Sequence, residues 1–174
     1  MGISDPNKIN VLPGVKEILK SASAAGWLNI VVTNQSGISR GFFSWENYEQ
    51  VSIHLINTLG DAHPIDAIYA NSNLPQNNSQ KSWRKPSPFM ILEAAEEFNI
   101  DLDKSILIGD RLTDLLAAKN AGIKKIFHVL TGHGFEERQK ILQNFPFKPI
   151  NKENILTNLE NLSDFPINDY FKFN

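Results

Sequence analysis

Apolar residues along this chain follow two alternating patterns, short continuous runs and longer stretches with helical spacing. The short runs predict strands at residues 27–33, 65–69, 105–109 and 125–130. The helical spacing predicts a helix that opens at Pro13 and ends at Gly26, a second one capped by Ser44 and stopped by Gly60, and others at residues 87–98, 113–121, 135–142 and 155–162. Strands that alternate with helices predict an α/β fold with a parallel sheet and right-handed crossovers.

The most informative stretch is residues 105–114, where an apolar run ends in a glycine and two acids. Residues 106–108 are all aliphatic, Asp110 stands at the carboxyl end of that run, and Asp114 follows four residues later. Open α/β sheets place their ligand sites at the carboxyl ends of strands, and carboxylate oxygens suit a hard cation such as Mg²⁺. The alternative is that Asp114 only caps the helix that begins near Thr113.

A second polar segment, Thr-Asn-Gln-Ser-Gly at residues 33–37, also follows an apolar run. Arg40 and Gly41 come shortly after it. A hydroxyl followed by several backbone N–H groups at a strand end can surround one anion, so this segment is a candidate phosphate site. The alternative is an ordinary polar turn.

Two adjacent cations, Arg84 and Lys85, precede a predicted helix start at Pro86. Cations beside the amino end of a helix add to its positive dipole and favour phosphate. A solvated surface pair is the alternative. All three segments lie at strand or helix junctions, so we expect them to act together.

In order and spacing, these motifs resemble the haloacid dehalogenase (HAD) superfamily of phosphatases, and within it the heptose bisphosphate phosphatase and histidinol-phosphatase branch. The residues that carry the resemblance are TNQSG-I-S-RG from Thr33, RKP from Arg84 and GD-x-x-x-D from Gly109. The neighbouring residues 12–15, 65–69 and 131–134 also match the family pattern, and the resemblance covers about residues 9–134. It implies one HAD-like Rossmannoid domain with a parallel sheet flanked by helices, followed by a C-terminal helical extension at residues 135–174.

The resemblance also implies a function and roles for the site. The expected activity is a Mg²⁺-dependent phosphoric monoester hydrolase that acts on a sugar bisphosphate, D-glycero-D-manno-heptose 1,7-bisphosphate. Thr33 would hold the transferring phosphoryl group and Lys85 would neutralise its charge. The implied substrate contacts are Asn34, Gln35, Ser36, Arg84 and, for the second phosphate, Arg111. The metal-site residues are Asp110, which would ligate Mg²⁺, and Asp114, which would orient that shell.

The family's nucleophile is not found where the resemblance would place it. It should lie in an Asp-x-Asp segment at the end of a first, central strand ahead of Pro13. No apolar strand followed by Asp-x-Asp occurs there, and Asp5 stands alone in a turn-like Ser-Asp-Pro-Asn. Phosphoryl transfer through an aspartyl phosphate needs that residue and a second aspartate as general acid and base. We expect a reading frame that starts at an internal methionine and lacks the first strand.

Two alternatives remain beside the phosphatase interpretation. An inactive sugar-phosphate-binding relic would keep the binding residues and lack the catalytic ones. A histidinol-phosphate phosphatase would differ only in its substrate. His133, within Thr-Gly-His-Gly after the last predicted strand, is a further candidate for contact with a ligand.

Composition narrows the class of protein further. The chain has 174 residues, 19 acids, 17 bases and no cysteine. Because acids and bases nearly balance, no strong positive potential would attract the chain to nucleic acid or to an anionic membrane. The sequence shows neither an apolar run of membrane length nor a leader pattern. We expect a cytoplasmic monomer whose partner is a small phosphorylated sugar.

Zinc is not expected, because the zinc-clip positions of the heptose branch hold no cysteine or histidine: they align with Asn71, Asn73, Lys81 and Trp83.

Overall fold

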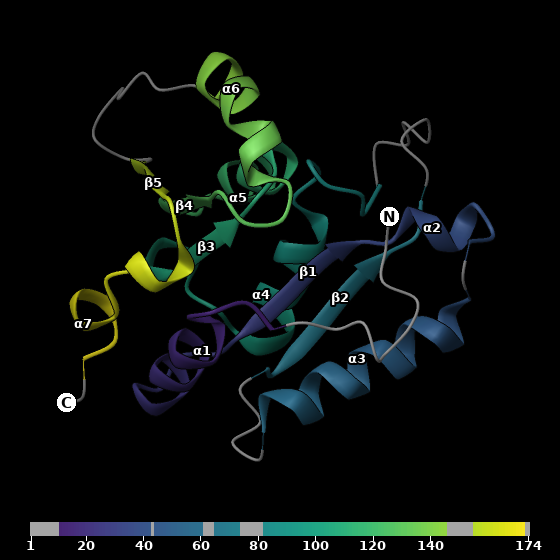
Figure 1. Ribbon diagram of the computed structural model, residues 1–174, viewed down its shortest axis with the longest axis horizontal. Coiled ribbons are helices and arrows are strands. Elements are labelled where there is room, and N and C mark those ends of the chain that lie inside the picture. The colour runs from purple at the N-terminus through teal and green to yellow at the C-terminus, as the bar shows by residue number, and fades with distance from the viewer. Residues whose placement is uncertain (1–10, 43, 61–64, 74–81, 146–154, 173–174) are drawn as a thin grey trace. The chain divides into compact units, whose positions relative to one another are not determined.

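The structure, a computed structural model, describes residues 11–42, 44–60, 65–73, 82–145 and 155–172. The chain forms two compact units, Met1–Asn77 with Phe165–Asn174 and Asn78–Asp164 (Figure 1). The predicted positions Asp5 and Lys81 lie outside the described residues, as does most of the loop that follows Asn73. Among the described residues, no helix is long and apolar enough to cross a membrane.

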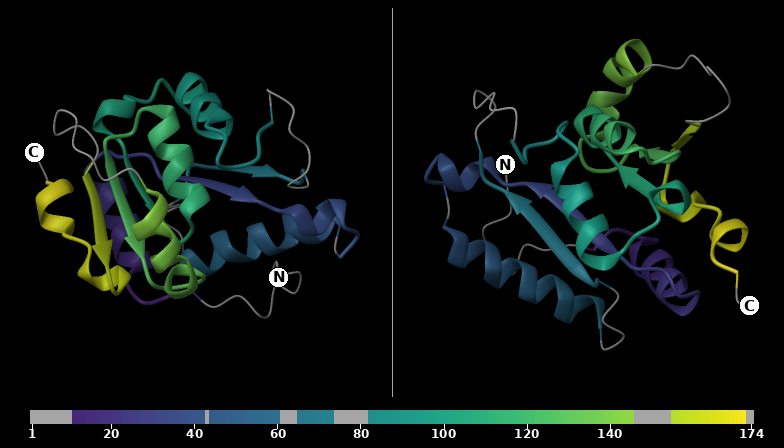
Figure 2. Two further views of the ribbon diagram at one scale, coloured as in Figure 1. Left: turned by 90° about the horizontal axis from the view of Figure 1, so that it is seen from above. Right: turned by 180° about the vertical axis from the view of Figure 1, so that it is seen from behind.

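The first unit is built on two parallel strands, which lie side by side in both views of Figure 2. Its elements are α1 (Val15–Ala24), β1 (Ile30–Asn34), α2 (Ser36–Ser39), α3 (Trp45–Leu59), β2 (Ala67–Asn71) and α7 (Ile167–Tyr170). The register pairs Ile30 with Ala67 and Asn34 with Asn71. The two strands therefore end together, and the segment that starts at Thr33 lies at their shared carboxyl edge.

Local sequence signals set the helix ends of this unit. Ser44 caps α3: its hydroxyl accepts the N–H of Asn47, and the Asn47 side chain accepts the N–H of Ser44. Gly60 follows the last helical residue, as predicted. The helix expected from Pro13 begins two residues later, because Gly14 takes a positive φ of 89° just before it.

The second unit contains a three-stranded parallel sheet in the order β3-β4-β5. Its elements are α4 (Phe89–Phe98), a 3-10 helix (Leu102–Lys104), β3 (Ile106–Gly109), α5 (Leu112–Ala121), β4 (Lys125–Val129), α6 (Gly134–Asn144), β5 (Ile155–Leu159) and a second 3-10 helix (Leu162–Asp164). Together the units confirm the predicted class of parallel sheets flanked by helices. The sheets are short, and β1 and β3 are edge strands within the part of the chain that the structure describes.

The core of the second unit forms where α5 packs on β3 and β4 and against α4. Leu115 and Ile126 are fully buried there, and Met90 joins them from α4. Each such side chain stabilises the fold by about 1.5–3 kcal/mol relative to leaving it in water. The packing fixes α5 against β3, so the turn between them is held at both ends.

One predicted helix is wrong. Residues 155–162 were expected to form a helix, but they form β5 and lead into the second 3-10 helix. β5 pairs with β4 from Lys125↔Ile155 to Val129↔Leu159, and Leu159 is buried. The hydrogen bonds of a neighbouring strand, about 30 residues away in the sequence, outweigh a weak local helical pattern, because strand preference depends on tertiary context.

Candidate active site

The turn between β3 and α5 carries the two acids of the GD-x-x-x-D motif. Gly109 ends β3, and a Cβ built on it would lie 2.7 Å from Cβ of Asp114, so this position requires glycine. Asp110 and Arg111 follow, and α5 begins at Leu112. The first turn of α5 therefore packs directly over the end of the strand and brings Asp114 close to Asp110.

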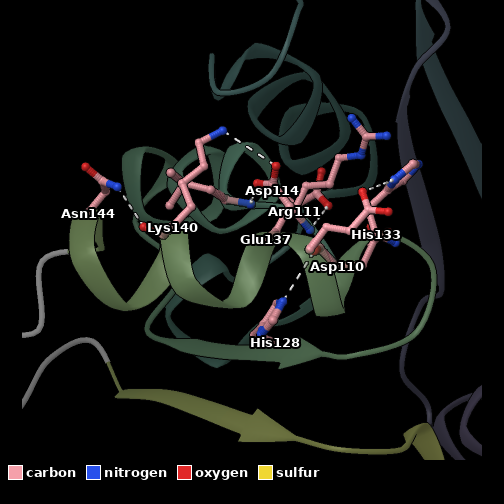
Figure 3. Close-up of polar contacts among 10 residues, drawn as sticks. Asp110, Arg111, Asp114, His128, His133, Glu137, Lys140 and Asn144 are labelled. Carbon is pink, nitrogen blue, oxygen red and sulfur yellow. Dashed lines mark hydrogen bonds and ion pairs between the residues drawn. The ribbon is translucent and has the colours of Figure 1, made fainter.

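The Asp110 carboxylate is oriented by the loop after β4. The backbone N–H of His133 donates to Asp110 Oδ2 at 2.7 Å (Figure 3). Gly132 lies against the same oxygen at a φ of +63°, and a Cβ there would overlap it. Within the described residues, Oδ1 has no hydrogen-bond partner in the protein. One of the two carboxylate oxygens is thus held by the loop after β4.

Lys85 and Asp114 form a nearly buried ion pair. Lys85 Nζ lies 2.6 Å from Asp114 Oδ1. The other oxygen, Oδ2, accepts the backbone N–H of Arg111 at 3.1 Å, so Asp114 also caps α5 as the alternative interpretation of the sequence expected. For Lys85, the alternative of a solvated surface cation is wrong. Arg111, by contrast, is exposed at the amino end of α5.

Three further side chains hold this turn from β4 and α6, and sequence reasoning missed them. His128 is fully buried in β4, and its Nε2 lies 3.3 Å from the backbone oxygen of Asp110 (Figure 3). Arg138 Nε donates to His128 Nδ1 at 2.8 Å. Glu137 Oε2 accepts the backbone N–H of Leu112 at 3.1 Å. The available signal was a histidine inside an otherwise apolar strand, Ile-Phe-His-Val.

The surroundings of His128 shift its pKa. Burial, and then the adjacent Arg138 guanidinium, lower the pKa of His128 below its ordinary value. The Asp110 backbone and carboxylate and the Asn158 side chain act in the opposite direction without reversing the shift. His128 is therefore a neutral imidazole at pH 7.

In the first unit, the predicted phosphate segment forms a compact turn at the carboxyl edge of β1 and β2. The Gln35 side chain donates to Thr33 Oγ1 at 2.9 Å, and the Gln35 backbone N–H donates to the Asn71 carbonyl at 2.6 Å. Ser36 opens the single helical turn α2, so the predicted polar segment is helical from this residue on. The predicted residues thus fall into two sets, Thr33–Ser36 in one unit and Arg84, Lys85, Asp110, Arg111 and Asp114 in the other. Convergence of the two sets remains a prediction.

Comparison with known proteins gives a consistent result. Residues 82–162 match the model of the HAD-hydrolase-like family. A D-glycero-beta-D-manno-heptose-1,7-bisphosphate 7-phosphatase of Helicobacter pylori is 36% identical over 124 residues, 70% of either chain. A protein of the same name from Pasteurella multocida is 33% identical over 153 residues, 85% of this chain and 83% of that one.

Among solved structures, a D,D-heptose 1,7-bisphosphate phosphatase from B. bronchiseptica, complexed with magnesium and phosphate, has a similar fold. The TM-score is 0.75 at 27% identity, over 93% of this chain and 84% of the other.

Proposed function

The chain belongs to the HAD-like heptose bisphosphate phosphatases, and from that membership we propose that it forms the magnesium and phosphate site of an enzyme that removes the 7-phosphate of D-glycero-D-manno-heptose 1,7-bisphosphate. The observation that carries the proposal is the arrangement at the end of β3. There, Asp110 Oδ1 has no hydrogen-bond partner among the residues that the structure describes, and Asp114, four residues on, pairs with the Lys85 ammonium.

Asp110 suits Mg²⁺ as a ligand. Mg²⁺ is usually bound by one or two carboxylates together with waters and substrate phosphates, so a dedicated cage of side chains is not needed. The described residues contain no cluster of three or more potential ligands. When bound, the ion would supply positive charge to the phosphoryl oxygens. Both oxygens of Asp114 already have partners, so we assign Asp114 an orienting role.

Lys85 and Arg111 are assigned to the two phosphates. An ammonium has three N–H donors, and the ion pair with Asp114 holds Lys85 in place. Arg111 is exposed at the amino end of α5, where the helix dipole adds to its charge, so it suits the second phosphate of the substrate. Lys85 would neutralise charge on the phosphoryl group that transfers.

The other predicted residues are further proposed substrate contacts. Thr33 would hold the transferring phosphoryl group, and its Oγ1 is already oriented by the Gln35 amide. The remaining proposed substrate contacts are Asn34, Gln35, Ser36 and Arg84. For Asn34, Gln35 and Ser36, the support is that residues 33–36 follow the carboxyl edge of β1 and β2.

The reaction itself requires an attacking carboxylate. In this family the resemblance implies an aspartyl phosphate, and no Asp-x-Asp segment occurs ahead of Pro13 in this chain. The residues described above can bind, orient and neutralise phosphate, but none of them is placed as the nucleophile. We therefore assign these residues the binding, orienting and charge-neutralising roles in the reaction.

The test compares the 174-residue chain with one extended at its amino end by an apolar strand that closes on Asp-x-Asp-Gly. Phosphate release from the heptose bisphosphate is measured with Mg²⁺, and histidinol phosphate serves as the comparison substrate. Release is expected only with the extended chain, since loss of a covalent nucleophile lowers the rate of a hydrolase on the order of 10⁶-fold. It is expected with the heptose bisphosphate and not with histidinol phosphate. Turnover by the 174-residue chain that Asp110→Asn abolishes would show that its nucleophile lies within these 174 residues.

A further inference from the structure

The peptide group that joins Asp110 to Arg111 is held on both of its polar atoms. Its N–H donates to Asp114 Oδ2 at 3.1 Å, and its carbonyl oxygen lies 3.3 Å from His128 Nε2. A peptide is planar, with its C=O and N–H pointing in opposite directions. Contacts on both sides therefore fix the rotation of that plane, and with it the direction in which the Asp110 side chain leaves the backbone.

The state of the His128 ring follows from its second contact. An arginine guanidinium is a hydrogen-bond donor only, so the 2.8 Å contact requires His128 Nδ1 to be the unprotonated acceptor. The single proton of the neutral ring is then on Nε2, which faces the Asp110 carbonyl. Arg138 is itself anchored, because its terminal nitrogen donates to the Leu159 carbonyl on β5 at 3.2 Å.

We propose that His128 is a positioning residue for metal binding: Arg138 holds its ring as the Nε2–H tautomer, and this N–H fixes the Asp110 carbonyl so that the carboxylate is aimed at Mg²⁺. The proposal rests on the function assigned to Asp110 above. It gives a buried histidine a role in the strength of metal binding, although its ring does not contact the metal or the substrate. Partners of this outer kind typically account for about 10- to 100-fold in metal affinity.

Four variants of the 174-residue chain separate this role from simple packing. His128→Phe keeps a ring and removes both nitrogens. His128→Gln places an amide N–H near the position of Nε2, whereas the shorter His128→Asn places its amide near Nδ1 and does not reach the carbonyl. His54→Phe, at an exposed histidine of α3, is the matched control. Affinity for Mg²⁺ alone is measured by calorimetry, and folding of each variant is checked by urea unfolding.

The dissociation constant for Mg²⁺ is expected to rise about tenfold or more in the Phe and Asn variants. It should stay close to the parent value in His128→Gln and His54→Phe. Equal affinity in the parent and a folded His128→Phe would overturn the inference and leave the proposed function standing. A parent chain that binds no Mg²⁺ would overturn both.

An independent measurement does not depend on any variant folding. Nitrogen-15 NMR of the labelled 174-residue chain reports which ring nitrogen of His128 carries the proton. The Nε2–H tautomer at pH 7 is the expected result, with His128→Gln used to assign the signal. A proton on Nδ1 would overturn the inference, whatever the metal affinities are.

Discussion

Replacing Lys85 with methionine removes one half of the ion pair that holds Asp114. The methionine keeps most of the aliphatic volume, so the change is mainly one of charge. The two side chains are only 10% and 11% exposed and their charged atoms are 2.6 Å apart. At an effective dielectric constant of about 20, their attraction is about 6 kcal/mol before the cost of removing both charges from water. The variant leaves the Asp114 carboxylate buried and uncompensated, which costs about 3–5 kcal/mol of unfolding free energy.

The matched control is Lys124→Met. Lys124 pairs with Asp103 at 3.1 Å, but these side chains are 42% and 68% exposed, so the loss should be about 0–1 kcal/mol. Urea unfolding at pH 7, followed by circular dichroism, gives both values from the shift in midpoint at unchanged slope. Adding Asp114→Asn to Lys85→Met removes the stranded charge and should recover part of the loss. Equal destabilisation by Lys85→Met and Lys124→Met would refute the placement of Lys85 in a buried pair.

Two further predictions concern the turn around Asp110. Gly132→Ala and Gly122→Ala both force alanine into a positive φ, at a cost of about 1–2 kcal/mol each. Only the new Cβ at Gly132 meets the Asp110 carboxylate, so Mg²⁺ affinity measured by calorimetry should fall in that variant alone, and an equal fall in both would contradict the geometry. Because burial and then Arg138 lower the pKa of His128, its contribution to stability is complete above the ordinary imidazole value of about 6.5 and is lost as the pH falls toward the folded-state pKa. Urea unfolding between about pH 7.5 and 5 should therefore show a loss of stability that is smaller in His128→Phe; identical pH profiles would contradict it.

Much of the fold follows from signals within a few residues of each other. Ser44 and Gly60 bound α3, and Gly122 ends α5 with a φ of 95°, each as predicted from residue type. β3 and β4 could be predicted because each of them is one continuous, mostly apolar run in the sequence. β5 was missed because its hydrogen bonds come from β4, and no pattern within residues 155–162 contains that information.

In the candidate site, too, local sequence signals indicate some residues, and other contacts depend on tertiary packing. Asp110 and Asp114 could be predicted as candidates from local sequence. Asp110 directly follows an apolar run that ends in glycine, and Asp114 stands four residues later at the start of the predicted helix. The ion pair of Lys85 with Asp114 spans 29 residues, and the contact of Glu137 with Leu112 spans 25. Such contacts depend on how α4, α5 and α6 pack, so the sequence could nominate Lys85 as a phosphate cation but could not predict its buried partner. His128 lies inside the apolar run of β4, and its contacts with Asp110 and Arg138 depend on tertiary packing in the same way.

The most direct test of the account is a calorimetric titration of D-glycero-D-manno-heptose 1,7-bisphosphate into the 174-residue chain, with and without Mg²⁺. The account predicts binding that requires Mg²⁺, is lost in Asp110→Asn and is much weaker for histidinol phosphate. Binding of the bisphosphate that is unchanged by removal of Mg²⁺ or by Asp110→Asn would contradict it, as would equally tight binding of histidinol phosphate.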